Sequence, residues 1–252
     1  MPNRTAQDTR LDHIPAPAEQ IVTEYDQFEV AEHPFFADLR RGPVDMTAMW
    51  LLMANLQRGI SEHFVRWLAA VISRVDNPRI ASLLAKQLND ELGNGDFRQI
   101  HSVLLQRFVD GLATWKPAQA DPLGRSVFDA GERLYQSMSE LFRRDPYEGV
   151  GALMVSEIFA KKMDRCVGDE IRRQSALSRE TLVWLDLHET LEMAHADDSL
   201  ELAYLLPTDG VPLEAAWAGA RKEWSALWSF LDTIQQTNAA LRQGRAANNQ
   251  SA

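Results

Sequence analysis

The sequence contains one cysteine, Cys166, among its 252 residues, so an intramolecular disulfide is excluded. No apolar run reaches the roughly 20 residues that a membrane-spanning helix needs. Residues 1–20 are polar and contain no apolar run of signal-peptide length. No period-two alternation typical of strands and no internal repeat is present. These absences predict a cytoplasmic protein that is built from helices.

Positive charge is also scarce. Lys and Arg number 26 against 36 Asp and Glu, and the formal net charge is −10. This balance argues against nucleic acid and against an anionic membrane surface as main partners, and it leaves carboxylates available to bind cations. The 45% hydrophobic and 25% charged residues are typical of a globular protein that is long enough to bury a substantial core.

The sequence predicts helix for almost the whole chain between its two ends. Residues 1–19 are expected to be a disordered leader and residues 242–252 a disordered tail. Within residues 20–241, apolar positions recur at helical spacing and Pro or Gly marks the turns. We expect Asp45 to cap one helix and Pro78 to open another. The predicted helices cover approximately residues 19–32, 46–74, 78–92, 96–112, 123–142, 147–173, 178–206 and 213–241. The sequence thus predicts a single all-α domain of seven or eight helices.

One helix carries a pattern that is typical of a metal site. His188, Glu192 and His195 lie in a long amphipathic segment without Pro or Gly. At about 100° per residue, the three side chains point into an arc of roughly 60°. Two imidazoles and a carboxylate on one face can bind a first-row metal such as iron. The alternative is a solvated polar face, and the choice depends on whether other helices supply matching ligands.

Two carboxylates lie among apolar residues, where a charge is costly unless it is paired or bound to a metal. Glu157 is the sole charge in residues 150–160, and a salt bridge to Lys161 is the alternative. Glu62 falls near the apolar face of the helix predicted over residues 46–74. The alternative there is an exposed position at the edge of that face.

Glu91 and His101 flank the break Gly93-Asn94-Gly95. A continuous helix would leave the two side chains about 80° apart, but two glycines let the backbone bend. The segment is either an ordinary junction with Gly93 as a C-cap or a deformable segment that brings both side chains to one site. In the second case one cavity would receive four Glu and three His: Glu62, Glu91, His101, Glu157, His188, Glu192 and His195. Carboxylates with imidazoles suit Fe(II) or Mn(II) better than Zn(II).

This set resembles the haem-oxygenase-like diiron oxidases and oxygenases, whose seven-helix fold is shared with haem oxygenases and thiaminase-like proteins. The match runs from about Pro34 to about Leu206. It has the form Glu, then Glu-Leu-Gly-x-Gly-Asp-x4-His, then Glu, then His-x3-(Asp/Glu)-x2-His. The ten-residue step from Glu91 to His101 resembles the N-oxygenase-like branch. Glu192 departs from the pattern, because many members have Asp at that position.

The resemblance implies a nonhaem diiron centre in which the seven residues hold two Fe(II) ions, with Glu157 bridging or joining them. Two Fe(II) ions and the co-substrate O2 would oxygenate the nitrogen of a small nitrogen-containing metabolite in natural-product biosynthesis. Oxidative C–C cleavage of an amino acid or related carboxylate is the alternative. The expected partners are an amine or amino-acid-derived substrate and an external electron donor. The resemblance is also compatible with a homodimer.

Other interpretations stay open at this point. Trp184, one turn before His188, would line the substrate pocket or belong to the core. A metal-free thiaminase-like hydrolase would want a nucleophilic cysteine such as Cys166, and a metal-free small-molecule-binding protein would leave the glutamates exposed or salt-bridged. His63 would be the proximal ligand of a haem protein, but haem leaves the buried-looking glutamates unexplained.

Overall fold

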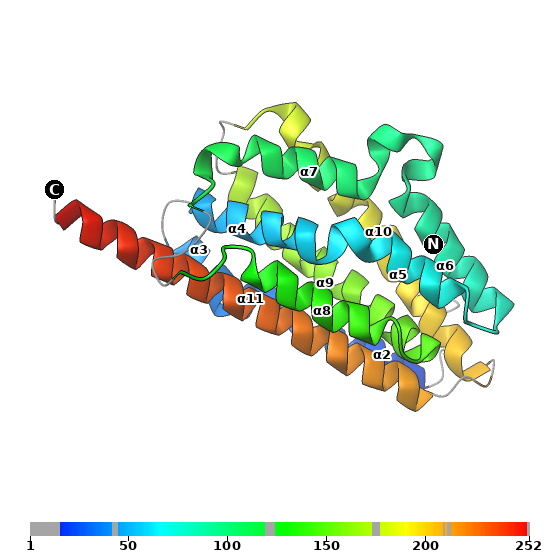
Figure 1. The fold of residues 1–252 in the computed structure, drawn as a ribbon. Coiled ribbons are helices and arrows are strands. Elements are labelled where there is room, and N and C mark those ends of the chain that lie inside the picture. The colour runs from blue at the N-terminus through cyan, green and yellow to red at the C-terminus, as the bar shows by residue number, and fades with distance from the viewer. Residues whose placement is uncertain are drawn as a thin grey trace, which may run out of the picture.

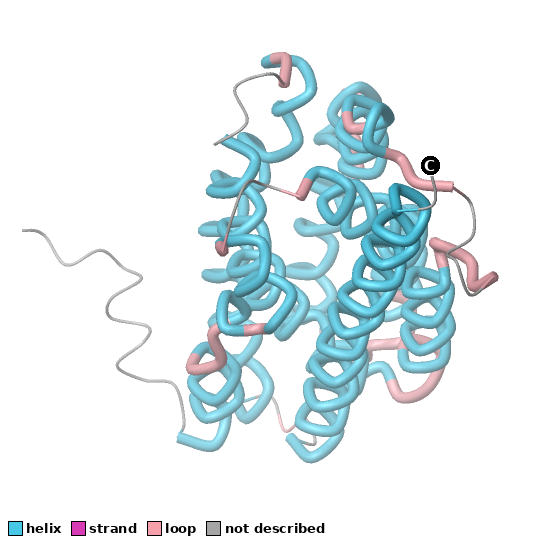
Figure 2. Tube along the Cα trace, turned by 90° about the vertical axis from the view of Figure 1, so that its left-hand side faces the viewer, coloured by secondary structure: helices cyan, strands magenta, loops and turns pink. Residues whose placement is uncertain are grey.

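The computed structural model describes residues 16–41, 45–118, 124–172, 177–208, 210 and 213–250, with the side chains of 16–19, 189–197, 208 and 248–250 outside the description. This part of the chain is helical and contains no β-strand, and short loops join the helices (Figure 2). Among the described residues no helix is both long enough and apolar enough to cross a membrane. The all-α prediction is confirmed.

The helices pack as one bundle (Figure 1). The α-helices are α2 (Ala16–Asp26), α3 (Pro34–Arg40), α4 (Met46–Leu56), α5 (Glu62–Ile72), α6 (Pro78–Glu91), α7 (His101–Gly111), α8 (Asp129–Leu141), α9 (Pro146–Arg172), α10 (Arg179–Thr208) and α11 (Leu213–Gln250). Short 3-10 turns are η1 (Val30–Glu32), η3 (Gly93–Gly95), η4 (Phe97–Gln99) and η5 (Ala113–Trp115), and η2 (Gln57–Ser61) is a π-helix between α4 and α5.

Local sequence signals fix several helix ends. The Asp45 carboxylate accepts hydrogen bonds from the backbone N–H groups of Thr47 and Ala48, at 3.1 and 3.2 Å. Asn77 caps α6, with Pro78 in the first turn. Both arrangements satisfy N–H groups that have no partner inside the helix, and both predicted starts are confirmed. At the other end of the chain, α11 runs on to Gln250, so residues 242–250, predicted as a tail, continue this helix.

The core lies around α4 and α9. Every residue of α4 is buried, and so is the apolar stretch from Val150 to Val155 in α9. The backbones of α9 and α11 approach so closely that a Cβ added at Gly151 would lie 1.9 Å from the Ala216 carbonyl oxygen. A Cβ at Gly219 would lie 1.8 Å from the Glu148 carbonyl oxygen. The absence of a side chain at these two glycines therefore permits the helix crossing.

The long helix predicted over residues 46–74 is interrupted by η2. A π-helix bonds each N–H to the fifth preceding carbonyl, so it holds one extra residue in the turn and rotates the following side chains relative to an α-helix. Asn55 holds the neighbouring helix in place, since its amide donates to the Val127 carbonyl at 2.8 Å and accepts from the Gly131 N–H at 2.8 Å. The π-helix decides which residues after Leu56 face inward.

The break after α6 is sharper than the sequence predicted. Gly93, Asn94 and Gly95 have φ values of 75°, 52° and 90°, which glycine adopts easily and asparagine tolerates. Asp96 then caps the next turn by accepting from the Arg98 N–H at 3.0 Å. As a result α7 begins at His101, whereas the prediction began the helix at residue 96. The chain folds back on itself between Glu91 and His101.

Candidate metal centre

A cavity of about 100 Å³ lies inside the bundle. Its lining comes from the end of α4, from η2, and from α5, α6, α7, α9, α10 and α11. Its wall combines apolar side chains with three carboxylates and three aromatic rings. The lining residues are Leu56, Ile60, Ser61, Phe64, Glu91, Leu105, Ser156, Glu157, Phe159, Ala160, Met163, Asp164, Trp184 and Leu227. Because the cavity is mostly apolar, the carboxylates on its wall are the groups that can interact with a bound cation.

Glu91 and His101 meet at this cavity. The Glu91 Oε1 lies 3.0 Å from the His101 Nδ1, and their side chains are 13% and 4% exposed. The fold-back at η3 and η4 places the start of α7 beside the end of α6. The break thus brings together two side chains that a continuous helix would have pointed apart.

His188 forms a second imidazole–carboxylate pair. Its Nδ1 lies 3.1 Å from the Oδ2 of Asp164, which is 1% exposed. The His188 ring centroid lies 4.9 Å from that of His101 and 4.2 Å from that of Trp184. A carboxylate on one ring nitrogen fixes the tautomer, so that the other nitrogen is left to act as a ligand. Trp184 also stacks on Phe108 at 5.8 Å.

Two more glutamates are buried on the α9 and α11 side. The Gln87 amide donates a hydrogen bond to the Glu157 carboxylate, which lines the cavity. Glu223 on α11 is 1% exposed and accepts a hydrogen bond from the Ser156 hydroxyl at 2.5 Å. Burial, helped by the charge of Glu157, raises the pKa of Glu223 to about 8. The Glu223 carboxyl is therefore largely protonated at neutral pH when no cation is bound.

The structure brings four of the seven predicted ligands to this region: Glu91 and Glu157 on the cavity wall, and the rings of His101 and His188 beside them. Glu62 is not brought there. Its side chain is exposed, because η2 turns Ser61 rather than Glu62 toward the cavity. The side chains of Glu192 and His195 lie outside the described residues.

Two buried acids near the cavity, Asp164 and Glu223, were not predicted as site residues. Asp164 follows Glu157 by seven residues, a spacing that places both on one helix face. Its neighbours include the cations Lys161, Lys162 and Arg165, so the local sequence resembles an ordinary charged helix surface. Glu223 stands between Lys222 and Trp224, and no local pattern sets it apart from an ordinary exposed glutamate.

The donor chemistry fits iron. Imidazole and carboxylate groups in a mostly apolar cavity are the ligands of helical diiron proteins. Within the side chains that the structure describes, no three His, Cys, Asp or Glu side chains converge closely enough to hold a metal ion. The side chains of Glu192 and His195, which the sequence analysis predicted to share a helix face with His188, lie outside that description.

A second concavity lies on the other side of α4 and η2. We call it the polar groove, and its volume is about 710 Å³. It contains three acids (Glu62, Asp110 and Glu132), His63, and the cations Arg58 and Lys116. The His63 ring lies against Tyr135, with 4.3 Å between ring centroids. The polar groove therefore contains Glu62, which the sequence analysis associated with the metal centre, and His63, which it associated with haem.

The chain belongs to a family of iron-containing redox enzymes, because the family's sequence profile matches residues 57–228, more than half of the chain. The fold is haem-oxygenase-like, as predicted. A domain of unknown function with a heme oxygenase-like fold from Shewanella denitrificans superposes with a TM-score of 0.63 at 15% identity, covering 94% of this chain and 95% of that one.

A CADD-like protein of unknown function from Nostoc punctiforme has the same fold. One of its structures gives a TM-score of 0.64 at 16% identity, covering 89% of this chain and 97% of that one. A second gives 0.59 at 17% identity, covering 91% and 94%. No curated protein matches this sequence. These structural likenesses establish the fold, and the family match places the chain among iron-containing redox enzymes.

Proposed function

We propose that this protein is a nonhaem diiron, O2-dependent oxygenase that oxidises the nitrogen of a small amine-containing metabolite. One observation carries the proposal: two imidazoles, His101 and His188, lie 4.9 Å apart, and each is within 3.1 Å of a carboxylate oxygen. Together with the family match, this pairing supports Glu91, His101, Glu157 and His188 as ligands. Glu192 and His195 complete the proposed set.

When bound, two Fe(II) ions would supply the two electrons that reduce O2, a reaction for which the protein provides ligation and a shielded pocket. The chain's own residues set the conditions. Asp164 holds the His188 ring by its Nδ1, and the Gln87 amide orients the Glu157 carboxylate. Phe64, Phe159 and Trp184 line the cavity and exclude water from the reacting atoms.

The cavity wall favours an amine as substrate. Three carboxylates, Glu91, Glu157 and Asp164, contribute to the wall, and no Lys or Arg is among the described lining residues. A protonated amine is attracted by this surface, whereas a substrate carboxylate finds no cationic partner on it. This supports N-oxygenation over oxidative C–C cleavage of an amino acid.

The metal-free hydrolase has weaker support. Cys166 would have to be its nucleophile, and burial raises the pKa of that thiol above its ordinary value, which lowers the fraction of reactive thiolate. Cys166 is also not among the described residues that line the cavity. A haem site at His63 is no better supported, because its ring lies in the polar groove.

The experiment is an anaerobic Fe(II) titration of the apo protein, followed by rapid mixing with O2 while visible absorption is recorded. We expect two irons per chain and a transient visible band. Amines should speed the decay of that band, and product analysis should show an oxidised nitrogen. A panel of amino acids and fatty acids tests the C–C cleavage alternative. No iron uptake, or uptake unchanged in Glu157→Ala/His188→Ala, would overturn the proposal.

A further inference from the structure

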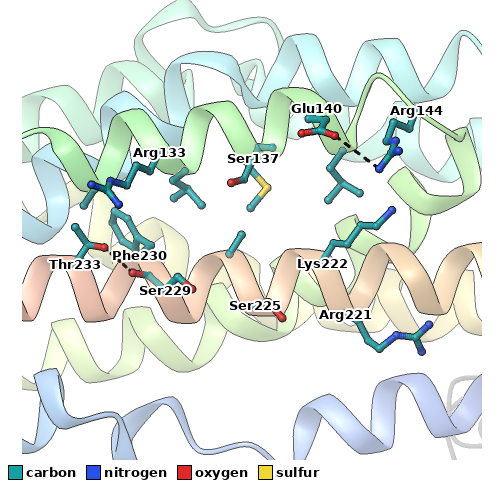
Figure 3. Close-up of a pocket in the computed structure, with 15 residues that line it drawn as sticks. Arg133, Ser137, Glu140, Arg144, Arg221, Lys222, Ser225, Ser229, Phe230 and Thr233 are labelled. Carbon is teal, nitrogen blue, oxygen red and sulfur yellow. Dashed lines mark hydrogen bonds and ion pairs between the residues drawn. The ribbon is translucent and has the colours of Figure 1, made fainter.

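A groove with cationic ends runs along the surface between α8 and α11 (Figure 3). We call it the α8–α11 groove, and its volume is about 580 Å³. Arg133 lies at one end, and Arg144 and Lys222 lie at the other. Ser137, Ser225 and Ser229 line it between the ends, and Arg221 belongs to the same lining.

The charge of this groove is opposite to that of the molecule. Among the described residues, four cations line it (Arg133, Arg144, Arg221 and Lys222) and one acid, Glu140, does so, whereas acids outnumber cations in the whole chain by 36 to 26. Arg133 pairs with Asp129 at 2.8 Å and Arg144 with Glu140 at 3.7 Å, both four residues apart on α8. Such exposed pairs are weak, and each guanidinium keeps donors for another carboxylate.

Lys222 is the more firmly held cation, since its Nζ lies 2.6 Å from the Glu148 carboxylate. Beneath the charged ends the floor of the groove is apolar, formed by Leu134, Met138, Leu141, Ala226 and Phe230. Charged edges around an apolar floor are what a protein partner with a complementary surface would bind.

The α8–α11 groove adjoins an aromatic hollow. Ser225 and Ser229 line both, and the hollow also contains Phe28, Trp224 and Trp228. Trp224 packs on Phe159, with 5.5 Å between ring centroids, and Phe159 lines the cavity of the candidate metal centre. A single aromatic side chain thus separates Trp224 at the hollow from the cavity.

We propose that the α8–α11 groove and the adjoining hollow dock an acidic electron-carrier protein that reduces iron in the cavity. This inference rests on the proposed function, because the proposed iron centre would consume electrons when it reduces O2. The carrier we propose is a [2Fe–2S] ferredoxin. In each transfer its reduced iron–sulfur centre would lose one electron and one Fe(III) would become Fe(II), with no proton or bond exchanged. Electron-transfer encounters bury small interfaces, and opposite charges speed their formation.

The polar groove is the poorer docking surface for such a carrier. Its three acids, Glu62, Asp110 and Glu132, outnumber its cations Arg58 and Lys116. An acidic partner would meet like charge there, which disfavours association.

The test measures binding of a plant-type [2Fe–2S] ferredoxin to the full-length apo protein by calorimetry, at low and at high NaCl. We expect binding at low salt that weakens steeply as salt rises. Arg133→Gln/Arg144→Gln should weaken it at least tenfold at low salt. The matched control Arg107→Gln/Arg179→Gln removes the same charge from α7 and α10, and α7 lies across the bundle from α11 (Figure 1). The control should change affinity less than twofold.

Ser137→Glu provides a second variant, because it places a negative charge on an exposed position within the groove and should weaken binding without removing any existing ion pair. Absence of ferredoxin binding at low salt would overturn the proposal. So would equal losses in the groove variant and its control, which would indicate attraction by diffuse charge. Ferredoxin binding is measured without iron, so its outcome can be interpreted separately from the iron titration. A failed iron titration would overturn the proposed function but would not change the measured ferredoxin affinity.

Discussion

The cavity and the polar groove contain the same kinds of side chain in opposite settings. In the cavity region Glu91, His101 and His188 are shielded from water, whereas Glu62 and its neighbour His63 face an open concavity. A carboxylate in water needs no partner, but one inside the bundle must bind a proton, a hydrogen-bond donor or a cation. Burial, more than residue type, is what distinguishes a candidate metal centre from a polar surface in this protein.

Removal of one histidine from each region should give the largest contrast. His101→Ala deletes a proposed ligand and should weaken Fe(II) binding by about 100-fold or more. His63→Ala should leave Fe(II) affinity within twofold, because its ring contacts Tyr135 and Trp67. Anaerobic titration of both variants provides the measurement. Equal affinities in the two variants would mean that the ligands lie elsewhere.

The pH dependence of stability should also separate the regions. The raised pKa of Glu223, about 8, means that the folded apo protein keeps a proton that the unfolded chain releases near pH 4.5. The contribution of this proton to the free energy of unfolding is therefore fully present below about pH 4.5 and is lost as pH rises toward 8. Between pH 6 and 8 the loss should be about 2–3 kcal/mol.

Urea unfolding of the apo protein at both pH values measures this loss. Glu223→Gln should flatten the dependence, since an amide keeps a hydrogen-bond acceptor for Ser156 without titrating. Glu62→Gln, a change at an exposed side chain, should leave the slope as it is in the unmodified protein. An unchanged slope in Glu223→Gln would contradict the assignment of the proton to this carboxyl.

Asp164 should show an intermediate effect. Asp164→Asn keeps the shape of the side chain but removes the charge that faces His188 Nδ1, and it should weaken Fe(II) binding about tenfold. Asp110→Asn is the matched change in the polar groove and should have no effect on iron. If Asp164→Asn binds iron normally, then this carboxylate does not position the His188 ring.

The smallest effect concerns the boundary between the two regions. A Cβ on Gly59, within η2, would lie 2.9 Å from the Gly131 carbonyl oxygen of α8. Gly59→Ala should therefore push the groove wall outward and destabilise the protein by about 1 kcal/mol. Iron affinity should stay within twofold, because Gly59 does not line the cavity. A denaturation midpoint equal to that of the unmodified protein would show that α8 can shift without cost.

Much of the fold could be predicted because local chemistry decides it. Asp45 caps α4 and Pro78 opens α6 as their sequence contexts indicate, and the glycines at 93 and 95 mark the real interruption. The helical spacing of apolar residues predicted an all-α domain. Glu157 is the sole charged residue in the apolar stretch 150–160, and this context correctly indicated that its side chain is buried. In each case the deciding interactions lie within one turn or one helix face.

The geometry of the site depended on tertiary structure. A π-helix at residues 57–61 shifts the helical phase by one residue. Glu62, which the sequence placed near the apolar face with an exposed edge position as the alternative, therefore faces solvent. The fold-back after Glu91, more than its helical angle, brings it to His101. The amino-acid sequence by itself therefore determined the helices and the residue types available for iron. Packing between helices decided which carboxylates are buried, because burial is set by neighbours that are distant in sequence, as Glu223 beside Ser156 illustrates.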